Sequence, residues 1–128
     1  MARIAIRGAI LLSLAACSYG PEPDRRTDYV VLFPPGQTEL AGTQREVIGW
    51  AAAAARALPG STVTVAGYAD PARAPQSNQI ESRIRAQLVA DALVQGGVPR
   101  SAVRVAPRRG IGGDPGIESG RVDIRIEP

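Results

Sequence analysis

An acidic and a basic side chain, Asp70 and Arg85, stand fifteen positions apart in a pattern that could bring them to one point. Asp70 follows the alternating run at 62–66, which predicts a strand with one exposed face. Arg85 lies in the second turn of a predicted helix, and a loop with two prolines joins that helix to the strand. A strand end and a helix start could therefore direct a carboxylate and a guanidinium at the same ligand.

Such a pair suits a ligand that carries an ammonium and a carboxylate on one carbon. A carboxylate accepts hydrogen bonds from an ammonium, and a guanidinium donates two parallel hydrogen bonds to a carboxylate. A purely structural role is the alternative. Glu81 and Arg85 are four apart in the order that stabilises an exposed helix. Asp70 before Pro71 is also common turn chemistry, so the spacing alone leaves both interpretations open.

The helix that carries Arg85 is indicated by a start signal and by an apolar repeat. Asn78 is predicted to cap the helix, and Glu81 three residues later completes a capping box. Apolar residues recur every four positions, which predicts a buried stripe with Arg85 at its edge. The stripe contains Ile80, Ile84, Leu88 and Ala92, and it is widened by Val89 and Leu93. We expect the helix to end at Gly96-Gly97.

Three segments around the pair form a longer pattern, namely Gly67-Tyr68-Ala69-Asp70, Asn78 and Ser82-Arg83-Ile84-Arg85-Ala86. This pattern resembles the signature of the OmpA-like peptidoglycan-binding domain family. In that family a Gly-His-Thr-Asp-like strand end is followed by Asn-x-x-Leu-Ser-x-x-Arg-Ala. The offsets from the Asp to the Asn, Ser and Arg are 8, 12 and 15 residues here, as in the family. The resemblance runs from about Tyr29 to Glu127.

The resemblance implies that Asp70 and Arg85 grip the diaminopimelate residue of peptidoglycan stem peptides. It also implies weaker ligand contacts from Asn78, Pro35, Gly36 and Arg121. The chain departs from the family pattern at Tyr68, Ala69 and Glu81, where the family has His, Thr and Leu. Pro35 has no backbone N–H to donate to a ligand.

The flanking elements are predicted from their apolar patterns. Residues 29–33 form a continuous apolar run, typical of a strand that is covered on both faces or lies near the sheet centre. Residues 43–58 predict a helix that ends at Pro59-Gly60, with Trp50 as an anchor in the core. The buried face of this helix is expected to contain Val47, Trp50, Ala51, Ala54 and Leu58.

Two alternating runs, at 102–106 and 121–126, predict two further strands. The last run places Val122, Ile124 and Ile126 inward. The order is therefore strand, helix, strand, helix, strand, strand, which predicts an α+β fold. We expect a two-layer sandwich in which two helices cover one face of a mixed four-stranded sheet. This is the architecture of the OmpA C-terminal-like domain that the central pattern resembles.

The start of the chain has the pattern of a targeting segment. Residues 1–16 combine Arg3 and Arg7 with an apolar run at 8–14 that is too short to span a bilayer as a helix. The run ends in Leu14-Ala15-Ala16-Cys17, which resembles the lipobox of bacterial lipoproteins and implies cleavage before Cys17 and acylation of that residue. A secretory peptide with a chance cysteine is the alternative.

The sequence thus divides into a lipoprotein signal peptide at 1–16, a lipidated Cys17 with a polar tether at 17–28, and a domain at 29–128. Ser18, rather than Asp, follows the cysteine, which in this class of protein favours the outer membrane. The domain would then face the periplasm, close to its membrane, because the tether is short.

Composition excludes several classes of function. The 128 residues suit one domain with one core. Outside residues 1–16 the chain has thirteen basic and twelve acidic groups, so its charges nearly balance. Its five aromatic residues provide few surfaces on which bases could stack. We therefore expect no nucleic-acid partner. The chain has no His, no nucleophile elbow and no cluster of metal-ligating residues. We therefore expect no enzymatic activity, no metal and no cofactor.

Two functions remain. The first is a lipid-anchored protein that binds peptidoglycan non-covalently and ties the outer membrane to the wall. The second is an OmpA-like domain that has lost wall binding and acts as a protein-interaction subunit of an envelope assembly. The second is favoured by Ala69, by Pro35 and by Gly120, which stands before Arg121 where the family has the first of two Arg residues.

Overall fold

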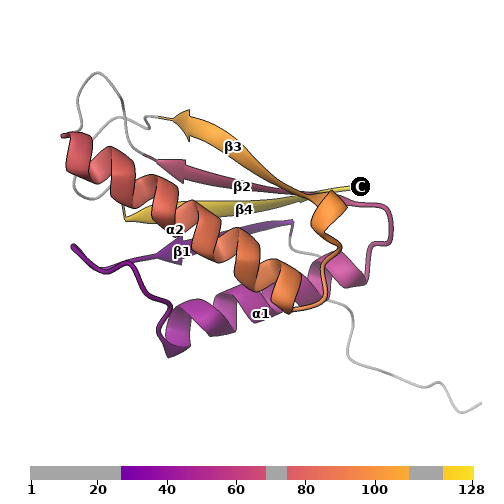
Figure 1. The fold of residues 1–128 in the computed structure, drawn as a ribbon. Helices are drawn as coiled ribbons and strands as arrows, with labels where there is room; N and C mark the ends of the chain where they lie inside the picture. Colours follow the sequence, from indigo (N-terminus) through magenta and orange to yellow (C-terminus); the bar gives the residue numbers. More distant parts are fainter. Residues whose placement is uncertain (1–26, 69–74, 110–119) are drawn as a thin grey trace, which may run out of the picture.

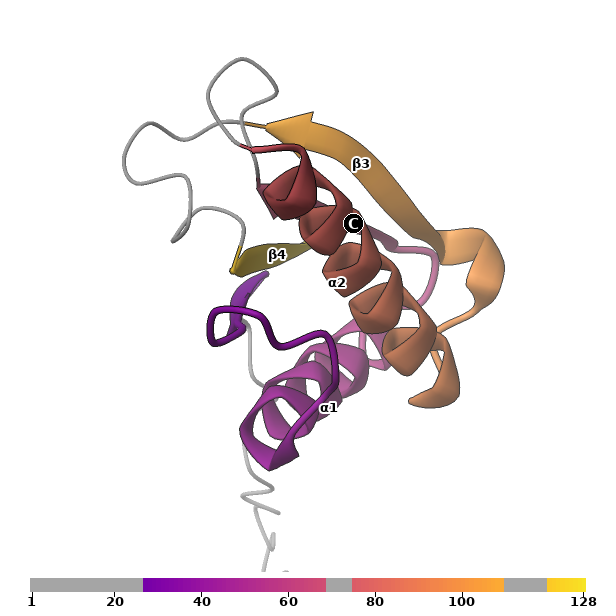
Figure 2. The same cartoon turned by 60° about the vertical axis from the view of Figure 1, so that its left-hand side comes forward.

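The computed structural model describes residues 27–68, 75–109 and 120–128 (Figure 1). Its elements in chain order are β1 (Asp28–Leu32), α1 (Gly42–Arg56), β2 (Thr62–Tyr68), α2 (Gln76–Gln95), the short 3-10 helix η1 (Arg100–Ala102), β3 (Val103–Arg109) and β4 (Arg121–Glu127). Both helices lie on the same face of the sheet (Figures 1 and 2). This arrangement confirms the predicted two-layer α+β fold. Within the described ranges, no helix is long and apolar enough to cross a bilayer.

The sheet is mixed, with strand order β1-β4-β2-β3. Strand β4 runs antiparallel to both β1 and β2, whereas β2 and β3 are parallel. The inner face of the sheet supplies one side of the core. Its fully buried side chains are Val31, Val63, Val65, Val122, Ile124 and Ile126. The predicted alternation of the last strand is therefore confirmed.

Strand β1 differs from its prediction. It lies at an edge of the sheet, and its burial alternates. Tyr29 and Val31 point into the core, while Val30 and Leu32 are 42% and 64% exposed. The expectation of a strand covered on both faces was wrong because both helices pack on one face, and the expectation of a central strand was wrong because the strand order puts β1 at an edge. A continuous apolar run does not reveal that the second face lacks a covering layer.

Helix α1 packs through small residues rather than through its tryptophan. Its buried side chains include Ile48 and the alanines at 51, 52, 54 and 55. Trp50 is 51% exposed, and Leu58 lies beyond the helix end with 41% exposure. Both were wrongly expected in the core. A methyl group added at Gly96 would lie 2.9 Å from the Ala52 side chain, so this contact is too close for large residues.

Helix α2 presents a different face to the core than its apolar repeat predicted. The buried side chains are Ser82, Arg85, Ala86, Val89, Ala90 and Leu93. Ile80 and Ile84 are 45% and 42% exposed, so the expected stripe was wrong at these positions. Leu88 and Ala92 are only partly buried.

The reason lies in the contact between α2 and β2. A Cβ at Gly67 would stand 2.8 Å from both the carbonyl oxygen and the Oγ of Ser82, and 3.3 Å from the Ala86 methyl. Only small side chains fit at this distance. The helix therefore turns its small residues inward, which carries Ile80 and Ile84 toward solvent.

Of the two predicted ends of α2, only the C-terminal one is confirmed. The helix begins at Gln76 with Pro75 at the N-cap, and that position makes no side-chain capping bond. Asn78 lies inside the first turn, so the predicted cap and capping box were wrong. Proline is well tolerated at a helix start because its missing N–H would have no partner there. At the other end Gly96 and Gly97 close the helix, with Gly97 at φ +95°.

Candidate functional site

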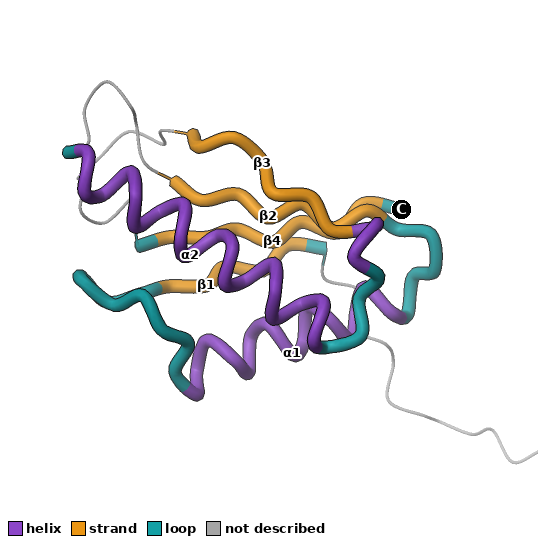
Figure 3. The backbone as a smooth tube through the Cα atoms, viewed as in Figure 1, coloured by secondary structure: helices purple, strands orange, loops and turns teal. Residues whose placement is uncertain are grey.

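Strands β1, β2 and β3 run in the same direction, and all three end beside the start of α2 (Figures 1 and 3). We call this the site end of the domain, marked by the turn at 34–37, Tyr68, the first turn of α2 and Arg121. The backbone N–H of Phe33 donates to the carbonyl of Gly120 at 2.8 Å, which ties the end of β1 to the beginning of β4. A strand end and a helix start do meet here, as the sequence predicted.

Arg85 is the central polar residue at this end. Its side chain is only 1% exposed. Nε donates to the carbonyl of Gln37 at 2.8 Å, and Nη2 donates to the carbonyl of Pro34 at 3.2 Å. The guanidinium carbon lies 5.5 Å from the centroid of the Phe33 ring, within range of a cation–π contact. Arg85 therefore fastens α2 to the segment that follows β1.

That segment is a tight turn. The N–H of Gln37 donates to the carbonyl of Pro34 at 3.1 Å, and Gly36 has φ +75°. Proline followed by a glycine of positive φ is the usual centre of a type II turn. The carbonyls that flank Pro35 and Gly36 are the ones that Arg85 holds. The structure thus brings Pro35, Gly36 and Arg85 together.

The charge of Arg85 is partly compensated within α2. Burial lowers the pKa of Arg85, and the carboxylate of Glu81 opposes that shift from 3.4 Å. The guanidinium remains charged at neutral pH, because an arginine side chain does not lose its proton in proteins. The predicted Glu81–Arg85 pair is therefore present, although Arg85 is buried rather than exposed.

Two predicted site residues lie outside the described residues. Asp70 stands two positions after the end of β2, and Cys17 precedes the domain. Asn78 lies in the first turn of α2 and is partly buried. The convergence of Asp70 with Arg85 therefore stays a prediction. Within the described ranges, no group of acidic or metal-ligating side chains could hold a metal ion.

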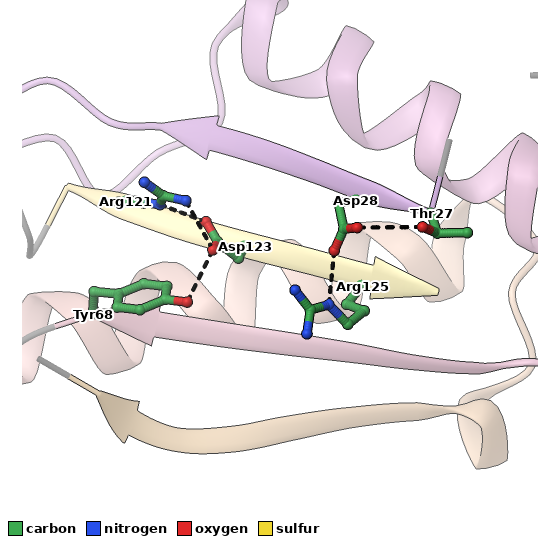
Figure 4. A network of polar contacts seen from close by, with 6 residues as sticks. All are labelled: Thr27, Asp28, Tyr68, Arg121, Asp123 and Arg125. Atoms are coloured by element: carbon green, nitrogen blue, oxygen red, sulfur yellow. Dashed lines mark hydrogen bonds and ion pairs between the residues drawn. The ribbon is translucent and has the colours of Figure 1, made fainter. Parts of the chain in front are cut away.

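Arg121 lies on the other face of the sheet (Figure 4). Its Nε is 2.7 Å from Oδ1 of Asp123, and its guanidinium carbon is 5.5 Å from the centroid of the Tyr68 ring. Tyr68 in turn donates its hydroxyl hydrogen to Oδ2 of Asp123 at 2.9 Å. The hydrogen bond to Asp123 raises the pKa of Arg121. Because Val122 points into the core, Arg121 points away from the helices and is not brought to the face of Arg85.

Several contacts at this end had no signal in the sequence. The carbonyls of Pro34 and Gln37 bind Arg85 across about fifty residues of chain. The Tyr68–Asp123 bond likewise depends on the pairing of β2 with β4. Apolar and turn patterns report local structure, so only the register of the sheet and the packing of α2 could reveal these partners.

The region from residue 32 to residue 121 matches the OmpA family. This chain belongs to the OmpA family. Among curated proteins, none matches the chain. Solved structures with the same fold include the peptidoglycan-associated lipoprotein from Burkholderia pseudomallei, which is 19% identical, with a TM-score of 0.62 over 77% of this chain and 90% of that chain.

Two further solved structures are similar to this chain. The OmpA-like domain of FopA1 from Francisella tularensis subsp. tularensis is 24% identical over 79% of this chain and 72% of that chain, with a TM-score of 0.63. The periplasmic domain of Helicobacter pylori MotB is 16% identical over 79% of this chain and 76% of that chain, with a TM-score of 0.60. At these sequence identities, the similarity to the three solved structures shows a shared fold.

The OmpA signature in this chain has two separable parts. Gly67, Ser82 and Ala86 meet at the close contact between β2 and α2, so their small size has a structural explanation. Arg85 is the charged member of the signature that the structure describes at the site end. The small positions therefore set the distance between helix and sheet, and the charged position lies at the site end.

Proposed function

We propose that this OmpA-family protein is anchored by lipid in the outer membrane and binds peptidoglycan non-covalently through diaminopimelate, with its domain in the periplasm. The observation that supports it most is the placement of Arg85 at the site end, beside the exposed turn of Pro35 and Gly36. Membership of the OmpA family and the fold shared with a peptidoglycan-associated lipoprotein support the same function.

The chemistry of recognition follows from the two charged positions. The free end of diaminopimelate carries an ammonium and a carboxylate on one carbon. Arg85 would bind the carboxylate and Asp70 the ammonium, with charge-assisted hydrogen bonds in both cases. Because two carbonyls and an aromatic ring already fix the guanidinium, little side-chain entropy remains to be lost on binding. Asn78, Pro35 and Gly36 would line the approach to the pair.

One observation favours the second candidate, an OmpA domain that serves as a protein-interaction subunit without wall binding. Arg85 is 1% exposed and bonded to backbone carbonyls, which is also how an arginine with a structural role is held. In this alternative the guanidinium stabilises the turn at 34–37, and the same end of the domain binds a protein.

Co-sedimentation with purified sacculi separates the two. Sacculi with diaminopimelate in the stem peptide should bind the wild-type protein, and sacculi with lysine at that position should not. Asp70→Asn should weaken binding roughly 30-fold or more, because removing one partner of a desolvated charge pair costs ~2–5 kcal/mol. Asp91→Asn, the same chemical change in the second half of α2, is the matched control and should bind like wild type.

Arg85→Lys tests the guanidinium, with the exposed Arg83→Ala as its control. A lysine ammonium cannot supply the planar fork that a carboxylate accepts, so binding should fall. Circular dichroism and thermal melting would verify that each variant is folded. Wild-type affinity in a folded Asp70→Asn variant would contradict the diaminopimelate site and favour the protein-interaction candidate.

A further inference from the structure

The two ends of this domain have different connections. Strand β1 pairs with β4 from Asp28 opposite Arg125 at one end to Leu32 opposite Arg121 at the other. The first residues of β1 and the last residue of the chain therefore lie together, at the end away from the start of α2 (Figure 1). We call this the termini end. Strand β1 runs directly from the termini end, where the predicted tether joins, to the turn that Arg85 holds.

Bonds fasten β1 at both of its ends. At the termini end the N–H of Ile126 donates to the carbonyl of Thr27 at 2.7 Å, and Arg125 is paired with Asp28 at 2.7 Å (Figure 4). At the site end Phe33 donates to Gly120, and Arg85 binds the carbonyls of Pro34 and Gln37. Arg85, the turn and β1 thus form one bonded connection from α2 to the tether.

The direction of a pull decides how these bonds share the load. Hydrogen bonds of an antiparallel ladder run perpendicular to the strands. A force along β1 therefore shears the whole ladder at once, and it must also drag the buried Tyr29 and Val31 through the core. A force that separates the two chain ends at the termini end instead peels β1 from β4 one bonded pair at a time.

We infer that β1 is the load-bearing strand of this domain, and that the domain resists tension applied between its N-terminal tether and its site end. The biological meaning of this inference rests on the proposed function, in which membrane and wall pull on those two points. The mechanical property itself depends only on the fold: tether and site stand at opposite ends of one strand, and the other chain terminus does not lie on that path.

Single-molecule force spectroscopy on the full chain tests the inference. Cys17 is the only cysteine, so in protein produced without lipidation its thiol serves as the first handle. The second handle is Ser77→Cys, at an exposed position in the first turn of α2, or Pro128→Cys, at the exposed end of the chain. The Cys17–Ser77→Cys pair loads β1 in shear, whereas the Cys17–Pro128→Cys pair peels it from β4.

The expected result is a severalfold higher mean unfolding force for the Ser77→Cys handle than for the Pro128→Cys handle at the same pulling speed. Adding Arg85→Lys should lower the force in the first geometry and leave the second unchanged, because the carbonyls that Arg85 binds follow the far end of β1. Equal forces in the two geometries would overturn the inference. No peptidoglycan is present in this measurement, so it succeeds or fails independently of sacculus binding.

Discussion

Ser82 and Arg85 are the two polar side chains on the buried face of α2, and their surroundings differ. Arg85 donates to two carbonyls at the site end. The hydroxyl oxygen of Ser82 is fully buried and has no hydrogen-bond partner within the described part of the chain. Serine fits at this position because its side chain is small enough to lie beside Gly67. The hydroxyl itself costs free energy when it is buried without a partner.

We therefore expect Ser82→Ala to raise the free energy of unfolding, by about 1 kcal/mol or more, because an unsatisfied buried hydroxyl costs ~1–3 kcal/mol. Part of the gain reflects the higher helix propensity of alanine. Ser77→Ala, at an exposed position of the same helix, measures that part alone. Urea denaturation of the two variants decides the matter, and a loss of stability in Ser82→Ala would mean that the hydroxyl has a partner.

Helix α2 as an element is defined by which of its faces is buried. Leu93 is fully buried, whereas Ile84 is 42% exposed. The helix meets the sheet through Gly67, Ser82 and Ala86, and this close contact fixes its rotation. The two large residues are therefore a matched pair for testing the orientation of the helix.

Leu93→Ala should lower the free energy of unfolding by ~2–5 kcal/mol, the usual cost of a cavity left by a large buried side chain. Such a loss is a large share of the stability of a small domain. Ile84→Ala should change the stability by less than ~1 kcal/mol, because the side chain is already partly in water. Chemical denaturation of both variants gives the comparison. Equal losses would show that α2 is rotated from the orientation described.

The pairing of β1 with β4 includes an exposed ion pair between Asp28 and Arg125. The hydrogen bond from Arg125 lowers the pKa of the Asp28 carboxyl below its ordinary value. The folded state therefore binds fewer protons at this site than the unfolded state does. The resulting stabilisation is complete above the unfolded pKa, near pH 4, and is lost as the pH falls through the lower, folded pKa.

Asp28→Asn should accordingly be less stable than wild type at pH 7, and the difference between the two proteins should fade as the pH falls below about 4. Urea denaturation over this pH range measures it. In the Asp28→Asn background, Arg125→Gln should cause little further loss at neutral pH, since its partner is already gone. A difference that persists at low pH would point to a role of Asp28 other than its ion pair.

At the scale of the whole molecule, the site end and the termini end have different roles. The termini end joins the predicted tether, and the site end holds the turn and Arg85. A tether of about ten residues reaches at most ~35 Å. With an anchor at Cys17, the domain would therefore stay close to its membrane and present the site end away from the tether.

The proposed anchor has a direct test. Cys17→Ala should leave an unprocessed precursor in the inner membrane that incorporates no labelled fatty acid, because the acylated thiol and the cleavage signal are both lost. Radiolabelling with palmitate and fractionation of the membranes measure the outcome, with Ser18→Ala as the control that keeps the cysteine. Normal maturation and labelling of Cys17→Ala would rule out the lipid anchor.

The sequence by itself determined the order of elements, the α+β architecture and the family. Alternation at 62–66 and 121–126, glycines at the end of α2 and the fixed offsets of the central pattern are local signals. These signals hold in the folded structure because each one depends on the conformational preference of a short segment of backbone. The inward positions of β4 and the end of α2 agreed with these signals.

Only the tertiary structure decided which faces and which partners those elements would have. The rotation of α2 depends on a glycine in β2, and the edge position of β1 depends on strand order. The buried face of α1 consists mainly of alanines, and Trp50 lies outside it. The carbonyl partners of Arg85 lie about fifty residues away. Such features arise from close packing between distant segments, where the fit of small residues outweighs the local apolar pattern.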